Sequence, residues 1–158
     1  MKILLSLLTG VLLCAATRAQ SYTPLPDFGK VDVSELQLKE CSFDKKASAM
    51  VLFAEQESLF KLDLTAPSQS RVFQQTTVHV RVKIFNKDGF NQANIKIGYP
   101  ISSDLISIKK LSAQTYNLDA SGNIVTTALD KSAIFDKKIN TRRAEKIFVM
   151  PAVKEGSV

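Results

Sequence analysis

The sequence predicts an all-β fold, in the form of an antiparallel β-sandwich-like domain. Apolar and polar residues alternate along several short segments, which is the pattern of strands with one buried face. Clusters of Gly, Asn and Asp separate these segments, as turns between strands require. The 3.6-residue apolar spacing of an amphipathic helix is nearly absent. Short strands joined by such turns are typical of antiparallel sandwiches and barrel-like sheets.

Residues 1–19 have the composition of an export signal. A Lys near the N-terminus is followed by an uncharged, largely apolar run, and small residues precede the expected cleavage between Ala19 and Gln20. The run is too short for a transmembrane helix, which needs about 20 apolar residues. We therefore expect an exported protein, in the periplasm or at the cell surface, with no integral membrane span. The alternative is a lipoprotein acylated at Cys14, which is disfavoured because Leu13 stands where a small residue is expected.

The remainder of the chain is sufficient for one modest domain. Removing the signal leaves 158 − 19 = 139 residues, enough for a single hydrophobic core. We expect an extended leader over residues 20–30 and the β-domain over residues 31–158. Because Cys14 leaves with the signal, Cys41 has no intramolecular partner, and we interpret it as a small buried hydrophobe. With one His and a single Cys after the signal, the composition disfavours a disulfide scaffold or a His-rich metal centre, and we expect no cofactor.

The first elements after the leader are a helical turn and two strand segments. Residues 34–37 read Ser-Glu-Leu-Gln and predict a capping box with a short helix. Residues 47–53 are nearly all apolar and predict a strand buried on both faces. The acidic residues of the segment 55–57 predict a break, and alternation over residues 58–64 predicts a further strand.

The clearest strand is predicted for residues 77–85. Its valines and Ile84 share one face, which we expect to be buried. The other face carries His79, Arg81 and Lys83, and we expect it to be solvated.

A turn and a second strand follow that segment. Residues 86–89 read Asn-Lys-Asp-Gly and predict a turn in which Gly89 adopts a positive φ. Alternation over residues 93–99 predicts a strand that forms a β-hairpin with the preceding one. Residues 105–116 predict another strand, with a β-bulge near residues 109–110 where the apolar parity changes.

The C-terminal third predicts one more hairpin. Residues 119–123 read Asp-Ala-Ser-Gly-Asn, a turn from which the strand at Ile124 returns. Residues 128–140 predict a loop with a helical turn, and residues 146–151 predict a short strand ended by Pro151.

Three segments resemble a domain-of-unknown-function family that precedes transglutaminase-like domains in exported bacterial proteins, notably in Bacteroidetes. Residues 41–53 are similar to its opening, in which an Asp precedes an Ala-x-Ala-x-x-Leu strand. Residues 81–89 resemble its Lys-Ile strand and Gly turn, and residues 151–158 resemble its Pro-x-Val-Lys-Glu-Gly-Ser motif. The family domain continues into a further strand, so the resemblance implies that this sequence is truncated near Val158. It also implies a papain-type catalytic domain downstream as the partner.

Cys41 and His79 are the only pair that resembles the machinery of nucleophilic catalysis, which needs a thiolate, a base and an orienting acid. His79 is expected on a solvated strand face, and Cys41 lacks the electropositive surroundings that lower a thiol pKa. The resembled family does not carry its catalytic Cys in this domain either. We expect no catalysis by this pair.

Other candidate sites have simpler interpretations. The acids Glu55, Glu57 and Asp63 are interpreted as solvated side chains at a turn and a strand end rather than as a glycosidase pair. No His and Cys spacing or Ca²⁺-loop pattern predicts a metal site. A basic cluster near the C-terminus is interpreted as a solvated loop, because acids are interspersed, stacking aromatics are missing and export removes nucleic-acid partners. That cluster comprises Lys137, Lys138, Arg142, Arg143 and Lys146.

Two functions from different classes follow. The first is a non-catalytic N-terminal β-domain of an exported transglutaminase-like protein, which positions the catalytic domain or its substrate. The alternative is a stand-alone secreted adhesion or glycan-binding β-sandwich. The alternative is less favoured because Tyr22, Tyr99 and Tyr116 do not cluster in the sequence and Trp is absent.

Overall fold

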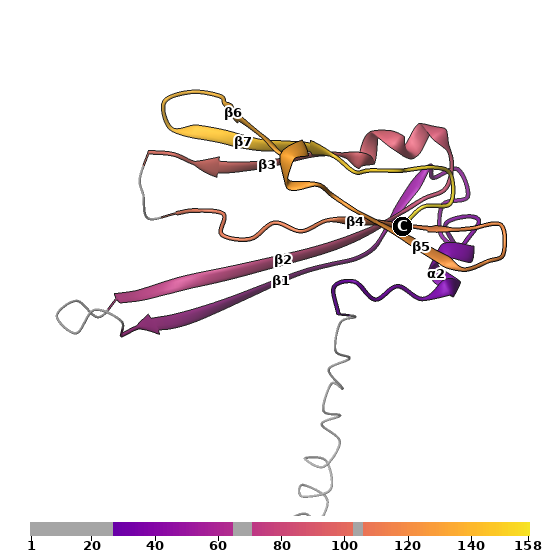
Figure 1. Ribbon diagram of the computed structural model, residues 1–158, viewed down its shortest axis with the longest axis horizontal. Helices are drawn as coiled ribbons and strands as arrows, with labels where there is room; N and C mark the ends of the chain where they lie inside the picture. Colours follow the sequence, from indigo (N-terminus) through magenta and orange to yellow (C-terminus); the bar gives the residue numbers. More distant parts are fainter. Residues whose placement is uncertain (1–26, 65–70, 103–105) are drawn as a thin grey trace, which may run out of the picture.

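The computed structural model of the protein describes residues 27–64, 71–102 and 106–158 (Figure 1). The predicted signal, with its cleavage site between Ala19 and Gln20, and most of the leader lie outside the described residues. Within these ranges strands predominate and all of them pair antiparallel, which confirms the all-β prediction.

Seven strands form three separate sheets in the described part of the chain. The first is a two-stranded ribbon of β1 (Ala49–Asp63) and β2 (Arg71–Ile84). The second has three strands in the order β3 (Asn94–Pro100), β7 (Arg143–Val149) and β6 (Phe135–Lys138). The third pairs β4 (Gln114–Leu118) with β5 (Ile124–Ala128). Figure 1 shows the ribbon as the longest element, with its far end projecting away from the helix α2 (Val33–Gln37).

Strand β1 is continuous, so the predicted break at residues 55–57 is wrong. Glu55 lies in the middle of the ribbon, directly opposite His79. The register shifts instead between Val51 and Phe53. Burial of this segment on both faces is also wrong, because Val51 is 57% exposed. Among the described residues, no layer excludes water from the face of the ribbon on which Val51 lies.

Strand β2 pairs with β1 and not with β3, so the predicted hairpin of residues 77–85 with residues 93–99 is wrong. The segment between the two strands forms the 3₁₀ helix η2 (Lys87–Ala93). Gly89 does not have the predicted positive φ. A Cβ at Gly89 would overlap the carbonyl group of Ser48, so a close backbone approach is what requires glycine here.

Two further local predictions are wrong. The cap of α2 is Asp32, whose side chain accepts a hydrogen bond from the Ser34 amide at 2.7 Å, so Ser34 does not begin a capping box. Residues 106–113 form no regular strand, and β4 begins only at Gln114, so the bulge predicted at residues 109–110 does not form.

The later predictions are largely confirmed. The β4–β5 hairpin forms around Asp119, whose side chain accepts from the amides of Ser121 and Asn123, each at 2.8 Å. Gly122 in this turn has a φ of 82°. The helical turn predicted within residues 128–140 is the 3₁₀ helix η3 (Lys131–Ala133), although β6 follows it in the same segment. Strand β7 covers the start of the segment predicted to end at Pro151.

The hydrophobic core lies where α2, β4 and the C-terminal residue meet. Leu36, Tyr116 and Val158 are its buried members. Leu118 and Ile124 from the β4–β5 hairpin pack against them, together with Val31 and Leu52. The base of the ribbon therefore contacts the core, whereas Phe60 and Val72, nearer its far end, are 76% and 69% exposed.

Candidate functional site

The polar side chains of β2 form the most constrained site in the described residues. We call His79, Arg81 and Lys83 the polar row. They were expected to be solvated, and that prediction is wrong: Arg81 is 6% exposed and Lys83 is 0% exposed. Residues 28–36 and the turn of residues 154–157, which we call the C-terminal turn, cover this face. Their carbonyl and carboxylate oxygens accept hydrogen bonds from both cations.

Arg81 joins the ribbon to α2. Its Nη1 donates to both carboxylate oxygens of Glu35, at 3.0 and 2.8 Å, and its Nη2 donates to the carbonyl of Lys30. The guanidinium also lies over the ring of Phe53, 4.8 Å from the ring centroid. The carboxylate, the backbone carbonyl and the stacked ring together offset the cost of burying the guanidinium of Arg81.

Lys83 joins the ribbon to two other segments. Its Nζ donates to the carbonyl of Leu36 at 2.7 Å and to the carbonyl of Gly156 at 2.6 Å. Both partners are neutral, so no carboxylate offsets the cost of burying the ammonium. Burial, together with the charge of Lys39, lowers the pKa of Lys83 to about 8.

His79 and Cys41 are held in structural positions. The His79 ring packs edge-on against Phe53, with ring centroids 4.7 Å apart, and lies 5.7 Å from the Phe28 ring. Cys41 is a free thiol that is 1% exposed, in agreement with its interpretation as a small buried hydrophobe. A catalytic thiol must be accessible to its substrate, and the thiol of Cys41 is not accessible from the surface.

The candidate carboxylates lie along β1, with Asp63 at its end opposite Arg71. Glu55 and Glu57 lie in the middle of β1, and not at a turn as predicted, opposite His79 and Thr77. Among the described residues, no group of three or more His, Cys, Asp or Glu side chains could hold a metal ion. No helix within the described ranges has the length and apolar character to cross a membrane.

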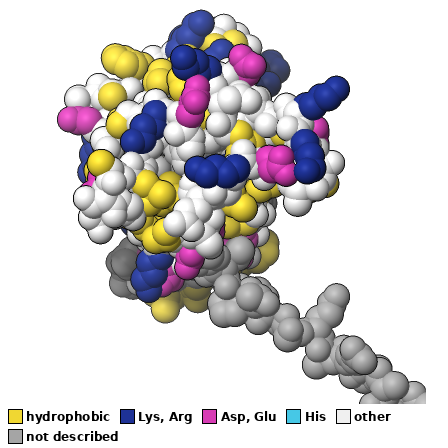
Figure 2. All heavy atoms as spheres, turned by 90° about the vertical axis from the view of Figure 1, so that its right-hand side faces the viewer, with side chains coloured by type: hydrophobic (Ala, Val, Ile, Leu, Met, Phe, Trp, Pro, Cys, Tyr) yellow, Lys and Arg dark blue, Asp and Glu magenta, His cyan; other side chains and the backbone are white. Residues whose placement is uncertain are grey.

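The C-terminal basic residues are distributed over β6, β7 and the turn between them. Lys146 pairs with Asp136 at 2.9 Å, and Lys137 lies opposite Glu145 in the ladder. Hydrogen bonds from Lys146 and Tyr99 hold the pKa of Asp136 below its ordinary value. Figure 2 views a different part of the surface, the side of α2 and the β4–β5 turn, and there too basic and acidic side chains are interspersed rather than gathered by sign. A strip of alternating charges is a poor match to a phosphate backbone.

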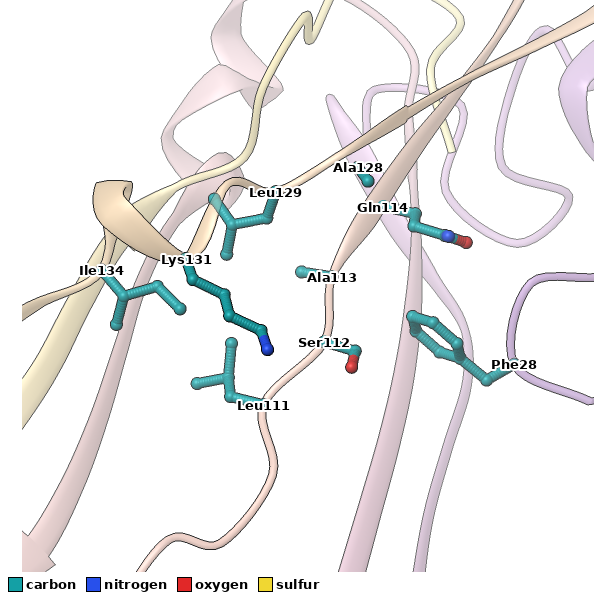
Figure 3. A pocket seen from close by; sticks show the side chains of 9 residues that line it. All are labelled: Phe28, Leu111, Ser112, Ala113, Gln114, Ala128, Leu129, Lys131 and Ile134. Carbon is teal, nitrogen blue, oxygen red and sulfur yellow. The ribbon is translucent and has the colours of Figure 1, made fainter.

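A shallow hollow of about 180 Å³ lies between Phe28, the segment before β4 and η3. Figure 3 shows the side chain of Lys131 reaching across it towards Leu111 and Ser112, with Ile134 at one side. Pockets for small-molecule ligands are usually about 300 Å³ or larger. The hollow therefore does not favour a small-molecule substrate.

The sequence patterns correctly placed the residues of the polar row on one face of a strand but wrongly predicted that this face is exposed to solvent. The acceptors that bury Lys83 lie 47 and 73 residues away along the chain, where no local signal indicates them. The contacts of Ser157 and Val158 were missed for the same reason. Comparisons with protein-family models, with curated proteins and with solved structures found no match to this chain.

Proposed function

We propose that the chain is a non-catalytic β-domain of an exported transglutaminase-like protein, and that it positions the catalytic domain or its substrate. The sequence resemblance of three segments, in the family's order, supports the family. The absence of an accessible nucleophile at Cys41 is consistent with a supporting role for this domain.

The observation that carries a positioning role is the apolar face of the ribbon. In the β1–β2 register, six large apolar side chains lie on the face opposite the polar row and are at least half exposed. They are Val51, Phe60, Leu62, Val72, Val78 and Val80. We call them the ribbon apolar face. Exposed apolar side chains on one face are typical of an interaction site. We propose that the catalytic domain of the same polypeptide packs against this face.

Two of the three tyrosines are unsuited to the glycan-binding alternative. Tyr116 is 6% exposed, and the hydroxyl of Tyr99 donates to Asp136 at 2.7 Å while Lys146 lies over its ring. Sugar stacking needs an aromatic ring with a free face. Tyr22 lies outside the described residues.

The proposal is tested on the product of the whole gene. Reading the gene beyond the codon for Val158 should reveal a Cys…His…Asp constellation; a stop codon at that point would remove the transglutaminase-like assignment. In the full-length protein, the double change Val78→Ser with Val80→Ser should lower kcat/KM for acyl transfer by about tenfold or more, because misplacing a substrate is costly. Leu59→Ser, on the opposite face of the ribbon, is the matched control and should leave kcat/KM unchanged. Equal values for all three proteins would refute a positioning role for this face.

A further inference from the structure

The outer edge of β1 has no pairing partner among the described residues. β2 occupies the inner edge, and no other strand or backbone hydrogen bond of the described chain reaches β1 between Ala54 and Leu62. Most side chains of this stretch are exposed, and Phe60 is 76% exposed. A long, exposed strand edge without Pro is competent to pair with another strand.

The hydrogen bonds of β2 show which residues of β1 face this free edge. The amide of Ile84 donates to the carbonyl of Ser157 at 2.9 Å, so the peptide groups of Ile84 face away from β1. Peptide groups alternate between the two edges of an antiparallel strand, so those of His79, an odd number of residues earlier, face β1. Glu55 pairs with His79, and its own peptide groups therefore face β2. The even-numbered residues of the range 54–62 consequently present their amides and carbonyls to the free edge.

Two opposite charges on this stretch have no counter-charge in their own chain. Neither Glu55 nor Lys61 forms an ion pair within the described residues. The ammonium of Lys61 donates to the neutral amide oxygen of Gln75 at 2.8 Å, an exposed contact that costs little to exchange. The two side chains lie on the same face of β1. They are six residues apart, roughly 20 Å along an extended strand, so they cannot pair within one copy.

A two-fold axis at Ser58 brings these charges together between two copies of β1. Ser58 then pairs with Ser58 of the second copy, and the even-numbered residues with free peptide groups face each other. In the same register, Glu55 of each copy lies directly opposite Lys61 of the other. Opposite charges on directly opposed residues stabilise an antiparallel strand pair, and the symmetry supplies two such pairs.

Charge disfavours the neighbouring registers. An axis at residue 57 sets Glu57 against itself, and an axis at residue 59 sets Glu55 against Asp63. Axes at residues 56 and 60 oppose Glu57 to Glu55 and to Asp63, respectively. Like charges directly opposite each other destabilise a strand pair. Of these five registers, the one centred on Ser58 opposes unlike charges without opposing like ones.

We propose that the outer edge of β1 is a homodimer interface, at which a second copy of this chain pairs antiparallel with β1 about a two-fold axis at Ser58. The two ribbons then form one four-stranded antiparallel sheet. Because the axis is perpendicular to the sheet, the ribbon apolar faces of the two copies lie side by side on the same side of it. This inference goes beyond the proposed function and does not depend on it.

The first test is charge reversal in the product of the whole gene, with the dimer Kd measured by sedimentation equilibrium. Glu55→Lys and Lys61→Glu should each raise Kd by roughly tenfold or more, because each change opposes two pairs of like charges. The double variant should return Kd to within about threefold of the starting protein, because both pairs form again with exchanged signs. Glu57→Lys, which lies opposite Leu59 of the second copy, is the matched control and should change Kd by no more than about threefold.

Amide hydrogen exchange locates the paired edge. Raising the protein concentration through Kd should slow exchange at Gln56, Ser58 and Phe60, whose amides face the second copy. Exchange at Val72 and Gln74, whose amides face the outer edge of β2, should not change with concentration.

Several outcomes would overturn the interface. A protein that remains monomeric throughout the concentration range would exclude it, and a double variant that does not recover association would show that Glu55 and Lys61 do not meet. A larger effect of Glu57→Lys than of Glu55→Lys would refute the axis at Ser58. Protection of the β1 amides that is independent of concentration would assign this edge to another segment of the same chain. Concentration-dependent protection of Val72 instead would assign the contact to β2.

Discussion

Between Val78 and Lys83 the two faces of β2 reverse the usual relation between polarity and burial, whereas the apolar Ile84 at the end of the strand is buried. Arg81 and Lys83 are buried, whereas Val78 and Val80 on the opposite face are 62% and 51% exposed. The difference lies in what covers each face. Carbonyl and carboxylate oxygens of α2, the leader and the C-terminal turn meet the cations, and within the described residues no comparable layer meets the two valines. Burial in this ribbon follows the available partners rather than the hydrophobicity of the strand.

The largest effect is expected from removing the amine of Lys83. Lys83→Ala leaves the carbonyls of Leu36 and Gly156 without their donor and opens a cavity, so the free energy of unfolding should fall by about 3 kcal/mol. Val80→Thr on the exposed face should change it by no more than about 0.5 kcal/mol. Urea unfolding measures both. Similar losses for the two variants would contradict the comparison between the faces.

A smaller loss is expected from the pair of Arg81 with Glu35. The two side chains are 6% and 23% exposed, so Glu35→Gln weakens a partly buried ion pair and should cost about 2 kcal/mol. Asp136→Asn, which breaks the more exposed pair with Lys146, is the control and should cost less than about 1 kcal/mol. Denaturant unfolding combined with a double-mutant cycle on Arg81 and Glu35 isolates the coupling between them. A coupling no larger than that of the control pair would show that Arg81 is held by its other contacts.

A third expected effect is a dependence of stability on pH. Burial lowers the pKa of Lys83 from its ordinary value of 10.5 to about 8 in the folded state. Between these two pH values the unfolded chain binds more protons, so the contribution of Lys83 to the free energy of unfolding rises with pH from about 8 to 10.5. The neutral amine still has two N–H groups for its two carbonyl acceptors, so deprotonation does not break the contact. Subtracting the pH profile of Lys83→Met isolates the term; a difference that is flat or falls with pH would contradict it.

The sequence patterns succeeded where the structure is local. The β4–β5 hairpin depends on Asp119 and Gly122, which act within five residues of each other through a side-chain acceptor and a positive φ. The short strand before Pro151 was also predicted, although its pairing was not. In these cases the residues that determine the conformation lie within the element itself.

The patterns failed where a choice between partners was needed. The segments 77–85 and 93–99 each alternate, and a turn-like sequence joins them, yet β2 pairs with β1 and β3 pairs with β7. Alternation gives the two faces of a strand but neither its neighbour nor the face that becomes covered. For the candidate site, the sequence identified Arg81 and Lys83 as one row. It did not indicate that the carbonyls of Leu36 and Gly156 accept the hydrogen bonds of Lys83.

The sequence by itself determined that this protein is built from antiparallel strands. It also located the β4–β5 hairpin and several of the segments that form strands. Periodicity and turn chemistry depend on residues close together in the chain, which is why these features can be read directly. Only the tertiary structure decided that Arg81 and Lys83 face inward, that the ribbon apolar face is exposed, and that residues 156–158 lie between β2 and β4. The first and third of these outcomes depend on backbone carbonyls and amides of distant segments, and the residue type does not identify such partners because every residue except Pro carries both groups.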